Sequence, residues 1–469
     1  MKRGKREEEE GGRETKRKRL LNKKKQLTLF FLSLFLSTFK YQVLDALVSE
    51  LVSALKEILR WEKEATGGGP SRRQTRTTLL QFEDFASSSA FRLLEKFAPC
   101  GLPCFNDDVQ GTASVGLAAL LAALRLGDSS SSSAIAGSSE EEGEEEANSS
   151  SSSSSTSLPR PLSSSLSDHL VLFYGAGEAG VGIGELVAAA IQKRSSSTRE
   201  LARRRCVFID SQGLVTAERA LKEKGLAHHK LPFAHEGLPR LEEDGKASDS
   251  LLLAAVRALR PTALVGVSTS PGAFSPRVLR EMARINARPI IMPLSNPTSL
   301  AECTFGEAVA MTRGRCVFAS GSPFDALEVT MRPQSSTSST SSSPSSSSFR
   351  RCSQANNAYI FPAVGAAALL TGATALGEGS FLAAAEALAA QATAADAASG
   401  LLFPPFSRAA EVSAAVAAAV AEELVRSGDG EVPQALEFFA RGAAREPGLG
   451  AWEAAARSRM VNLGSTSKL

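Results

Sequence analysis

The feature that most constrains this chain is a series of short apolar runs, each ended by a turn or acidic residue and separated by helical patterns. Runs of this length that are apolar on both faces are typical of buried parallel strands. The gaps carry helical spacing, as in GIGELVAAAIQKR after the first run and PRVLREMARIN after the third. This alternation predicts an α/β fold with a doubly wound parallel sheet. The predicted strands are VLFYG (171–175), CVFID (206–210), TALVGVS (262–268), PIIMPLS (289–295) and CVFAS (316–320).

Two serine-rich segments, near 128–166 and 333–350, divide the 469 residues. Neither can bury enough apolar surface to offset the entropy lost on ordering, so both are expected to be disordered inserts. Residues 1–40, a charged run followed by a short apolar stretch, are expected to be a disordered leader. Beyond residue 360 the chain is rich in alanine with helical spacing, which predicts helices that pack on another part of the protein.

The charge balance argues against two classes of partner. Lys and Arg total 53 against 50 Asp and Glu, and this net charge of +3 gives no global reason to expect nucleic acid or a membrane. The apolar stretch at 27–39 is also shorter than the roughly 20 residues that span a bilayer. Six cysteines at irregular spacing do not form a recognisable disulfide framework, so we expect an intracellular protein, in the cytoplasm or an organelle.

A glycine-rich turn follows the first predicted strand and opens the next helix: Gly175, Ala176, Gly177, Glu178, Ala179 and Gly180. In a GxGxxG motif the first glycine permits the tight turn, the second lets the backbone approach a pyrophosphate, and the third allows close helix–strand packing. The pyrophosphate would lie at the helix N-terminus, where free N–H groups and the helix dipole favour anions. The motif therefore predicts a dinucleotide site, and the alternative is a glycine-rich turn that binds nothing.

The choice of dinucleotide depends on the end of the second predicted strand. Asp210 stands where an acid can bond a ribose hydroxyl, about 35 residues beyond the fingerprint where about 20 is usual. The charged stretch QKRSSSTRELARRR, interpreted as an extension of the crossover helix, accounts for the difference. Asp210 alone favours NAD, whereas Ser211 and Lys230 could receive the 2′-phosphate of NADP. The alternative for Lys230 is a surface lysine, and spacing alone favours that alternative.

Two acidic motifs precede the glycine turn: QFEDF, with Glu83 and Asp84, and NDDVQGT, with Asp107 and Asp108. Neighbouring side chains on a strand point to opposite faces, so Glu83 and Asp84 can share a target only at a strand end or a turn. Together with an acid of the second motif they would form a set of hard oxygen ligands suited to Mg²⁺ or Mn²⁺. The alternative is ordinary surface acids and a helix N-cap.

Several longer stretches resemble the malic enzymes, the oxidative decarboxylases of malate. QFEDFASSSAFRLLEKF and CFNDDVQGTASVGLAALLAAL are similar to the metal-binding stretch of that family, and YQVLDALVSELVSALKE (41–57) resembles the helix before it. The similarity covers about residues 41–445 apart from the serine-rich inserts. It continues in the family's order through GAGEAGVGIGELV, IDSQGLV, PFAHE, PIIMPLSNPTSLAECT, GRCVFASGSPF, QANNAYIFPAVG and LLFPPFSRAAEVS.

The resemblance implies a fold in two pieces. A Rossmann-like dinucleotide domain would cover residues 106–355. Segments 41–105 and 356–469 would pack together as a second, helical domain. It further implies an oxidoreductase with malate and pyruvate as substrate and product, and a homo-oligomer.

The resemblance also implies roles for single residues. The divalent-metal ligands would be Glu83, Asp84 and Asp108, and Asp107 would support the catalytic lysine. Asn296, in SNPTS, and Asn357, in QANNAY, would hold the substrate and the nicotinamide end of the cofactor. Ser211 and Lys230 match positions that contact the 2′-phosphate in members that use NADP, which moves the expectation from NAD to NADP. The cofactor site would comprise Gly175, Ala176, Gly177, Glu178, Ala179, Gly180, Asp210, Ser211, Lys230 and Asn296.

The sequence also departs from that family. We do not find in it the YTPTVG-like motif of the catalytic tyrosine, the GIPVGK-like motif of the catalytic lysine, or the substrate-binding arginine. Its three tyrosines, Tyr41, Tyr174 and Tyr359, lack that context. We therefore expect a truncated malic enzyme that binds cofactor and metal but turns malate over poorly. The alternative is a non-catalytic dinucleotide-binding protein that associates with full-length subunits, whereas another kind of dehydrogenase would not explain QFEDF and FNDD together.

Overall fold

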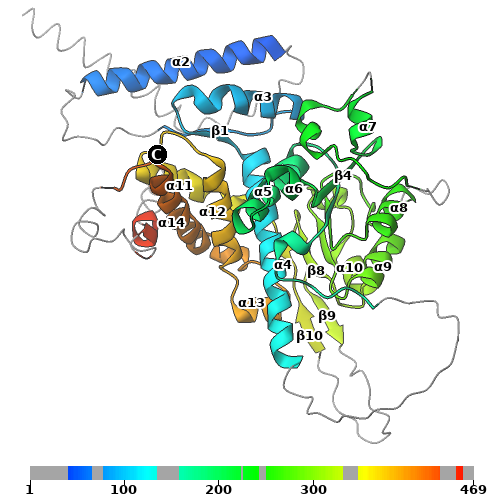
Figure 1. Ribbon diagram of the computed structural model, residues 1–469. Helices are drawn as coiled ribbons and strands as arrows, with labels where there is room; N and C mark the ends of the chain where they lie inside the picture. The colour runs from blue at the N-terminus through cyan, green and yellow to red at the C-terminus, as the bar shows by residue number, and fades with distance from the viewer. Residues whose placement is uncertain are drawn as a thin grey trace, which may run out of the picture. The chain divides into compact units, whose positions relative to one another are not determined.

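A computed structural model describes residues 41–65, 78–134, 158–222, 225–241, 250–330, 347–433, 450 and 452–457 (Figure 1). The chain divides into two compact units, Met1–Asp107 and Asp108–Leu469. The predicted leader, residues 1–40, lies outside the described residues, as do 135–157 and 331–346 within the serine-rich segments.

The first unit combines two helices with a short parallel strand pair. Helix α2 (Tyr41–Ala65) forms over the 41–57 segment, as expected, and buries Leu44, Val48 and Val52, which recur every four residues on one face. Strand β1 (Leu80–Phe82) pairs in parallel with β2 (Cys104–Asn106), and α3 (Ser87–Phe97) and the 3₁₀ turn Ala98–Cys100 lie between them in sequence. Side chains from these elements share one core with α2.

The second unit contains a seven-stranded sheet in the order β11-β8-β7-β6-β3-β4-β5. All neighbouring strands are parallel except the last pair, in which β4 and β5 form a short antiparallel ladder. The α/β class and all five predicted strands are therefore confirmed. The strands are β3 (Val171–Tyr174), β4 (Cys206–Asp210), β5 (Gly213–Leu214), β6 (Ala263–Gly266), β7 (Ile290–Pro293), β8 (Val317–Ser320) and β11 (Ser353–Gln354).

Helices cover both faces of this sheet (Figure 1). On one face α8 (Ser250–Leu259), α9 (Pro276–Ile285) and α10 (Phe305–Met311) share a core with strand residues such as Leu172, Leu264 and Ile291. On the other face lie α4 (Thr112–Ala134) and α5 (Glu178–Arg194), which pack on each other. This is the doubly wound arrangement that the alternating pattern predicts.

The alanine-rich C-terminal part forms α11 (Phe361–Thr371), α12 (Glu378–Ala389), α13 (Ala394–Ala398) and α14 (Ala409–Ser427). Within the second unit α14 packs on α11 and α12, and α12 packs on α4. Ion pairs from Lys193 and Arg194 to Glu386, each 3.0 Å long, also join α5 to α12. The packing of residues 356–469 on 41–105 stays a prediction.

One helical stretch of the described residues, Asp107–Leu126, has the length and apolarity of a membrane span. However, 78% of its most apolar window is buried inside the protein. A core helix of this kind explains the apolar composition, because α4 lies between α5 and α12.

The remaining elements are short. They are α6 (Arg199–Arg203), α7 (Ala217–Ala220), the antiparallel pair β9 (Leu327–Thr330) and β10 (Ser347–Arg350), a π-helical turn Asp107–Gly111, and 3₁₀ turns Leu166–Asp168, His228–Phe233, Thr298–Leu300, Asn357–Tyr359 and Phe406–Arg408.

Three boundaries differ from those that the sequence predicts. Helix α4 continues to Ala134, and the backbone of Arg160 bonds Ile285 and Ala287 at 3.0 and 2.8 Å, so the insert expected at 128–166 is too long at both ends. The insert expected at 333–350 likewise ends in β10, whose backbone pairs with β9. Finally, the charged stretch after α5 does not extend it, because a separate helix α6 begins after Thr198, whose side chain caps it.

Candidate functional site

The glycine-rich turn joins β3 to α5 at the carboxyl edge of the parallel strands. Gly175 has φ +117°, and a Cβ there would lie 2.5 Å from the backbone oxygen of Val267. An L side chain is therefore excluded by conformation and by space. At Gly180 a Cβ would lie 2.7 Å from the Gly175 oxygen, so the third glycine lets α5 approach the turn closely. Ala176 is buried in the same turn and Ala179 is half-buried.

The middle glycine faces open space. Gly177 is the N-cap of α5, and a Cβ built there meets nothing within 4 Å. The first N–H groups of a helix have no partner within the helix and attract anions. The turn thus combines a helix N-terminus with room for a group to approach the backbone, which is the arrangement a pyrophosphate needs.

Asp210, at the end of β4, is the centre of a charged cluster. Its Oδ2 accepts hydrogen bonds from Lys230 Nζ at 2.8 Å and from Arg219 Nη2 at 3.1 Å, and its Oδ1 accepts one from the Gln212 amide at 2.9 Å. Burial alone would raise the pKa of Asp210, but these hydrogen bonds together hold it below its ordinary value. The carboxylate is 8% exposed, and the exposed Ser211 follows it.

Lys230 of this cluster was predicted from the sequence, whereas Arg219 was not. Arg219 lies in α7 and also donates to the backbone oxygens of Gly213 and Leu214, at 3.0 and 2.7 Å. These bonds fix the guanidinium beside Asp210. The available signal was a basic residue in the stretch that follows the second strand, which sequence spacing alone does not distinguish from a surface arginine.

A second acidic pair lies near the start of α5. Burial, and next the charge of Asp108, raise the pKa of Glu178 to about 7. The negative charge of Asp108 disfavours ionisation of Glu178, and a cation nearby would be stabilised by both carboxyl groups. Asp107, the residue before Asp108, is buried.

Asn296 and Asn357 follow β7 and β11, two strands that run parallel to β3. Their positions after the strands place both at the same carboxyl edge as the glycine turn. Asn296 is exposed, precedes a cis peptide bond to Pro297, and accepts a hydrogen bond from the Ser322 hydroxyl at 3.1 Å. Asn357 is half-buried at the start of a 3₁₀ turn.

Glu302 is a second residue that the sequence analysis missed. Its carboxylate is fully buried and accepts hydrogen bonds from Ser268, after β6, and from Ser295, after β7. A buried acid must be compensated by such bonds, since an uncompensated buried charge is costly. The only sequence signal was an acid inside the apolar segment LAECTF, which has no meaning until the neighbouring strands are known.

The predicted metal ligands belong to different units of the chain, Glu83 and Asp84 to the first and Asp108 to the second. Glu83 and Asp84 come directly after β1, and Asp84 has φ +59°, so the two acids lie at a strand end as the spacing requires. Glu83 accepts a hydrogen bond from Gln81 at 2.6 Å. Asp108 belongs to the second unit, and among the residues that the structure describes no three His, Cys, Asp or Glu side chains gather to hold a metal ion. The shared metal site stays a prediction.

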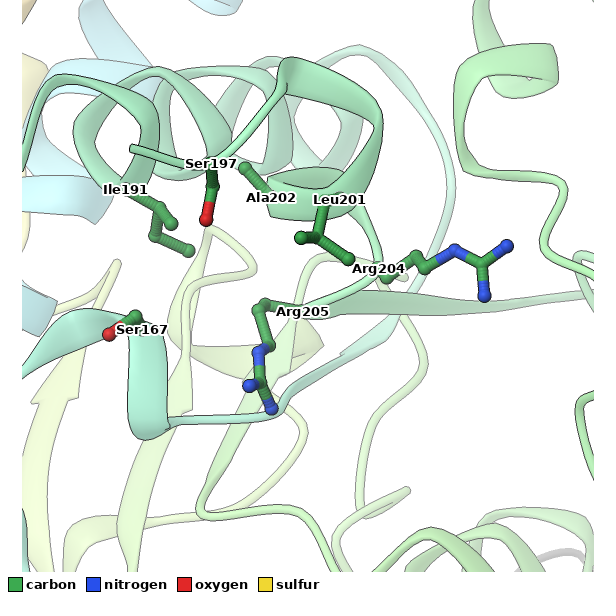
Figure 2. A pocket seen from close by; sticks show the side chains of 7 residues that line it. All are labelled: Ser167, Ile191, Ser197, Leu201, Ala202, Arg204 and Arg205. Carbon is green, nitrogen blue, oxygen red and sulfur yellow. The ribbon is translucent and has the colours of Figure 1, made fainter. Parts of the chain in front are cut away.

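A pocket of about 290 Å³ lies apart from this site (Figure 2). Arg205 immediately precedes β4 and Ser167 lies before β3, so the pocket is at the amino edge of the strands, opposite the glycine turn. Arg204 extends away from the other lining side chains (Figure 2). The pocket is therefore separate from the candidate dinucleotide site. It is lined by Ser167, Ile191, Ser197, Leu201, Ala202, Arg204 and Arg205.

Comparison with known proteins agrees with this geometry. Residues 154–425 match the family model described as malic enzyme, NAD binding domain. The chain is 40% identical over 342 residues to NADP-dependent malic enzyme 3 of Arabidopsis thaliana, covering 73% of this chain and 47% of that protein. It is 38% identical over 372 residues to NADP-dependent malic enzyme of Phaseolus vulgaris, covering 79% and 51%. Two further relatives carry the word chloroplastic in their names.

A solved structure shows the same fold. The crystal structure of Entamoeba histolytica malic enzyme superposes with a TM-score of 0.53 at 18% identity, covering 85% of this chain and 62% of that one. The chain spans about half the length of the curated relatives it matches.

Proposed function

The chain belongs to the malic enzyme family, and from this premise we propose that it binds NADP and serves the oxidative decarboxylation of malate to pyruvate and CO₂. The observation that carries the proposal is the glycine turn beside the cluster of Asp210, Lys230 and Arg219, on two adjacent parallel strands. This is the edge of a doubly wound sheet at which dinucleotides bind.

The cluster favours NADP over NAD for an electrostatic reason. In an NAD site the acid at this position accepts hydrogen bonds from ribose hydroxyls. Here both oxygens of Asp210 already accept hydrogen bonds within the protein, and two cations offset its charge. Lys230 and Arg219 can each turn further donors to a 2′-phosphate, and the exposed Ser211 adds a hydroxyl beside them.

At the other end of the cofactor we assign the amides of Asn296 and Asn357 to the nicotinamide and the substrate. Both follow strands of the same sheet at the edge where the glycine turn lies. An amide offers both donors and an acceptor, which suits a carboxamide or carboxylate. Asp107 is assigned to support a catalytic lysine.

We further propose that Glu83, Asp84 and Asp108 hold Mg²⁺ or Mn²⁺. Carboxylate oxygens are the ligands that these hard cations prefer, and after burial the negative charge of Asp108 contributes to the raised pKa of Glu178. A bound divalent cation would supply Lewis-acid polarisation of the malate hydroxyl and carboxylate. We also propose a homo-oligomer located inside the cell, in the cytoplasm or an organelle.

A second candidate function is dinucleotide binding without turnover. The observation that favours it concerns Tyr359, whose hydroxyl is buried and donates a hydrogen bond to the Pro404 oxygen at 2.8 Å. Burial also raises the pKa of Tyr359 to about 12, which is poorly matched to proton transfer near neutral pH. Following NADPH at 340 nm with malate and Mn²⁺ separates the two candidates, since turnover in the ordinary range of about 1–10³ s⁻¹ would reject the second.

The cofactor proposal is tested with Gly177→Val. Because a Cβ at this position meets no atom within 4 Å, the side chain of valine is expected to obstruct an approaching pyrophosphate rather than the fold. The matched control is Gly377→Val, since Gly377 is likewise an N-cap with nothing within 4 Å of its Cβ. We expect the first variant to lose NADP binding in a fluorescence titration and the second to retain it. Equal affinity of wild type and Gly177→Val would refute the site.

A further inference from the structure

Glu302 is a fully buried acid whose hydrogen bonds all converge on one oxygen. Its Oε1 accepts from the Ser268 amide at 2.9 Å, the Ser268 hydroxyl at 3.1 Å and the Ser295 hydroxyl at 2.5 Å. Within the described part of the chain, Oε2 has no hydrogen-bond partner. Burying a carboxylate that accepts hydrogen bonds at only one of its oxygens lowers the stability of the fold. The presence of Glu302 at this position therefore needs an explanation.

Strand β6 leaves room for the carboxyl group of Glu302. Gly266 is the last residue of β6, and a Cβ there would overlap the Cδ of Glu302. Any side chain at this position would displace the carboxyl group. The carboxyl group of Glu302, which comes from the segment before α10, therefore packs in the space that a side chain at Gly266 would occupy.

The acid joins two loops that leave neighbouring strands. Ser268 lies in the loop after β6, and Ser295 lies after β7, directly before Asn296. The Ser295 hydroxyl also accepts from the amide of Thr269 at 2.9 Å, and Thr269 has φ +53°, an unfavourable conformation for a β-branched residue. The loop after β6 is thus held to the loop after β7 through Glu302 and Ser295.

These two loops lie on the path of the bound cofactor. The sheet order places β6 next to β3 on the side opposite β4, and β7 next to β6. A dinucleotide whose adenosine end meets Asp210 on β4 and whose pyrophosphate meets the turn after β3 must extend its other end over β6 and β7. Burial, with the charge of Glu302, also raises the pKa of Tyr174, which places Glu302 near the end of β3.

We infer that Glu302 is a positioning residue, which fixes the Ser268 and Ser295 loops and thereby holds Asn296 where the nicotinamide half of the cofactor binds. The inference rests on the proposed NADP function. It assigns to Glu302 no contact with the cofactor, so its effect must pass through the two loops.

The test compares two ligands that share the adenosine end. NADP carries the nicotinamide riboside, and 2′-phospho-ADP-ribose lacks the nicotinamide. We expect Glu302→Ala to weaken NADP binding about tenfold, because the two loops no longer hold Asn296 in place, while changing the affinity for 2′-phospho-ADP-ribose less than about twofold. Glu302→Gln keeps an Oε1 acceptor for both serines and should restore most of the NADP affinity.

The matched control is Glu307→Gln, which removes the capping-box acid of α10 five residues away without touching either loop. It should lower the melting temperature and leave the ratio of the two affinities unchanged. Ser295→Ala, which leaves both hydrogen bonds from Ser268 to Glu302, should reproduce the selective loss of NADP affinity if Glu302→Ala does not fold.

Two results overturn the inference. If the wild type binds both ligands and Glu302→Ala (or Ser295→Ala) weakens both equally or neither, the positioning role is refuted and the cofactor proposal stands. If the wild type binds neither ligand, the cofactor proposal fails and the inference falls with it.

Discussion

The substitution Lys230→Gln tests the origin of cofactor preference most directly. Lys230 Nζ lies 2.8 Å from Asp210 Oδ2, and the two side chains are 21% and 8% exposed, so solvent screens the pair only weakly. A phosphate that approaches Asp210 meets the charge of Lys230 and Arg219 in the wild type, but only that of Arg219 in the variant. Glutamine retains the size and a donor while removing the positive charge.

The magnitude follows from the loss of one charged hydrogen bond. Such a bond contributes about 1.5–3 kcal/mol, and each 1.4 kcal/mol changes an affinity about tenfold. The variant should therefore lose roughly ten- to hundred-fold in NADP affinity and much less in NAD affinity. Most of the wild-type preference for NADP disappears as a result.

The assay is a fluorescence titration of both cofactors against the wild type, Lys230→Gln and a control. Lys193→Gln is the matched control, because Lys193 is 52% exposed and pairs with Glu386 on a helix far along the chain from the cluster. A surface pair of this kind contributes little, so its removal should leave both affinities unchanged. Preference for NAD by the wild type, or an unchanged preference in Lys230→Gln, would refute the reasoning.

Three other predictions follow from single residues. Gly175→Ala should lower the unfolding free energy by about 2 kcal/mol or more in chemical denaturation, because the position combines φ +117° with a backbone oxygen 2.5 Å from the added Cβ. The control Gly306→Ala, on α10 with nothing within 4 Å of its Cβ, should be neutral or stabilising. Equal effects of the two substitutions would contradict this account. Asp108→Asn should weaken Mn²⁺ binding measured by electron paramagnetic resonance, since an amide offers a hard cation less charge, and unchanged binding would remove Asp108 from the ligand set. Burial above all lowers the pKa of His169 below 6.5, so the unfolded chain binds this proton more readily than the folded chain. The contribution of His169 to the unfolding free energy is therefore complete above pH 6.5 and is lost as the pH falls below that value. His169→Gln should make the unfolding free energy depend less on pH in this range. An unchanged slope between about pH 5 and 6.5 would show that His169 does not control it.

The sheet was predictable because its strands are continuous apolar runs. Each of the five predicted strands is buried on both faces, and only that environment explains runs such as CVFI and PIIM. The break after α5 was less evident, since the segments IQKR before it and RELARRR after it both suit a helix and only the serines at 195–197 and Thr198 separate them. The side chain of Thr198 decides the matter by capping α6.

The site was predictable where it depends on local sequence. The glycine turn needs only a strand, three glycines and a helix, all adjacent in the chain. Arg219 and Glu302 depend instead on which strands become neighbours. Glu302 acquires its partners because β6 lies beside β7, and the sheet order is not contained in the local pattern around LAECTF.

Several departures from ordinary local rules lie at the carboxyl edge of the sheet. Gly175 and Thr269 adopt positive φ there, Gly266 gives up its side chain to a buried acid, and Asp210 binds two cations while 8% exposed. Each of these features costs stability by itself, and a fold that needed only to be stable would replace it with an apolar contact. Because they lie on or after the three strands β4, β3 and β6, which are adjacent in the sheet, they define one extended surface. A ligand that spans that surface, with an anionic centre over the glycine turn, accounts for all of them together.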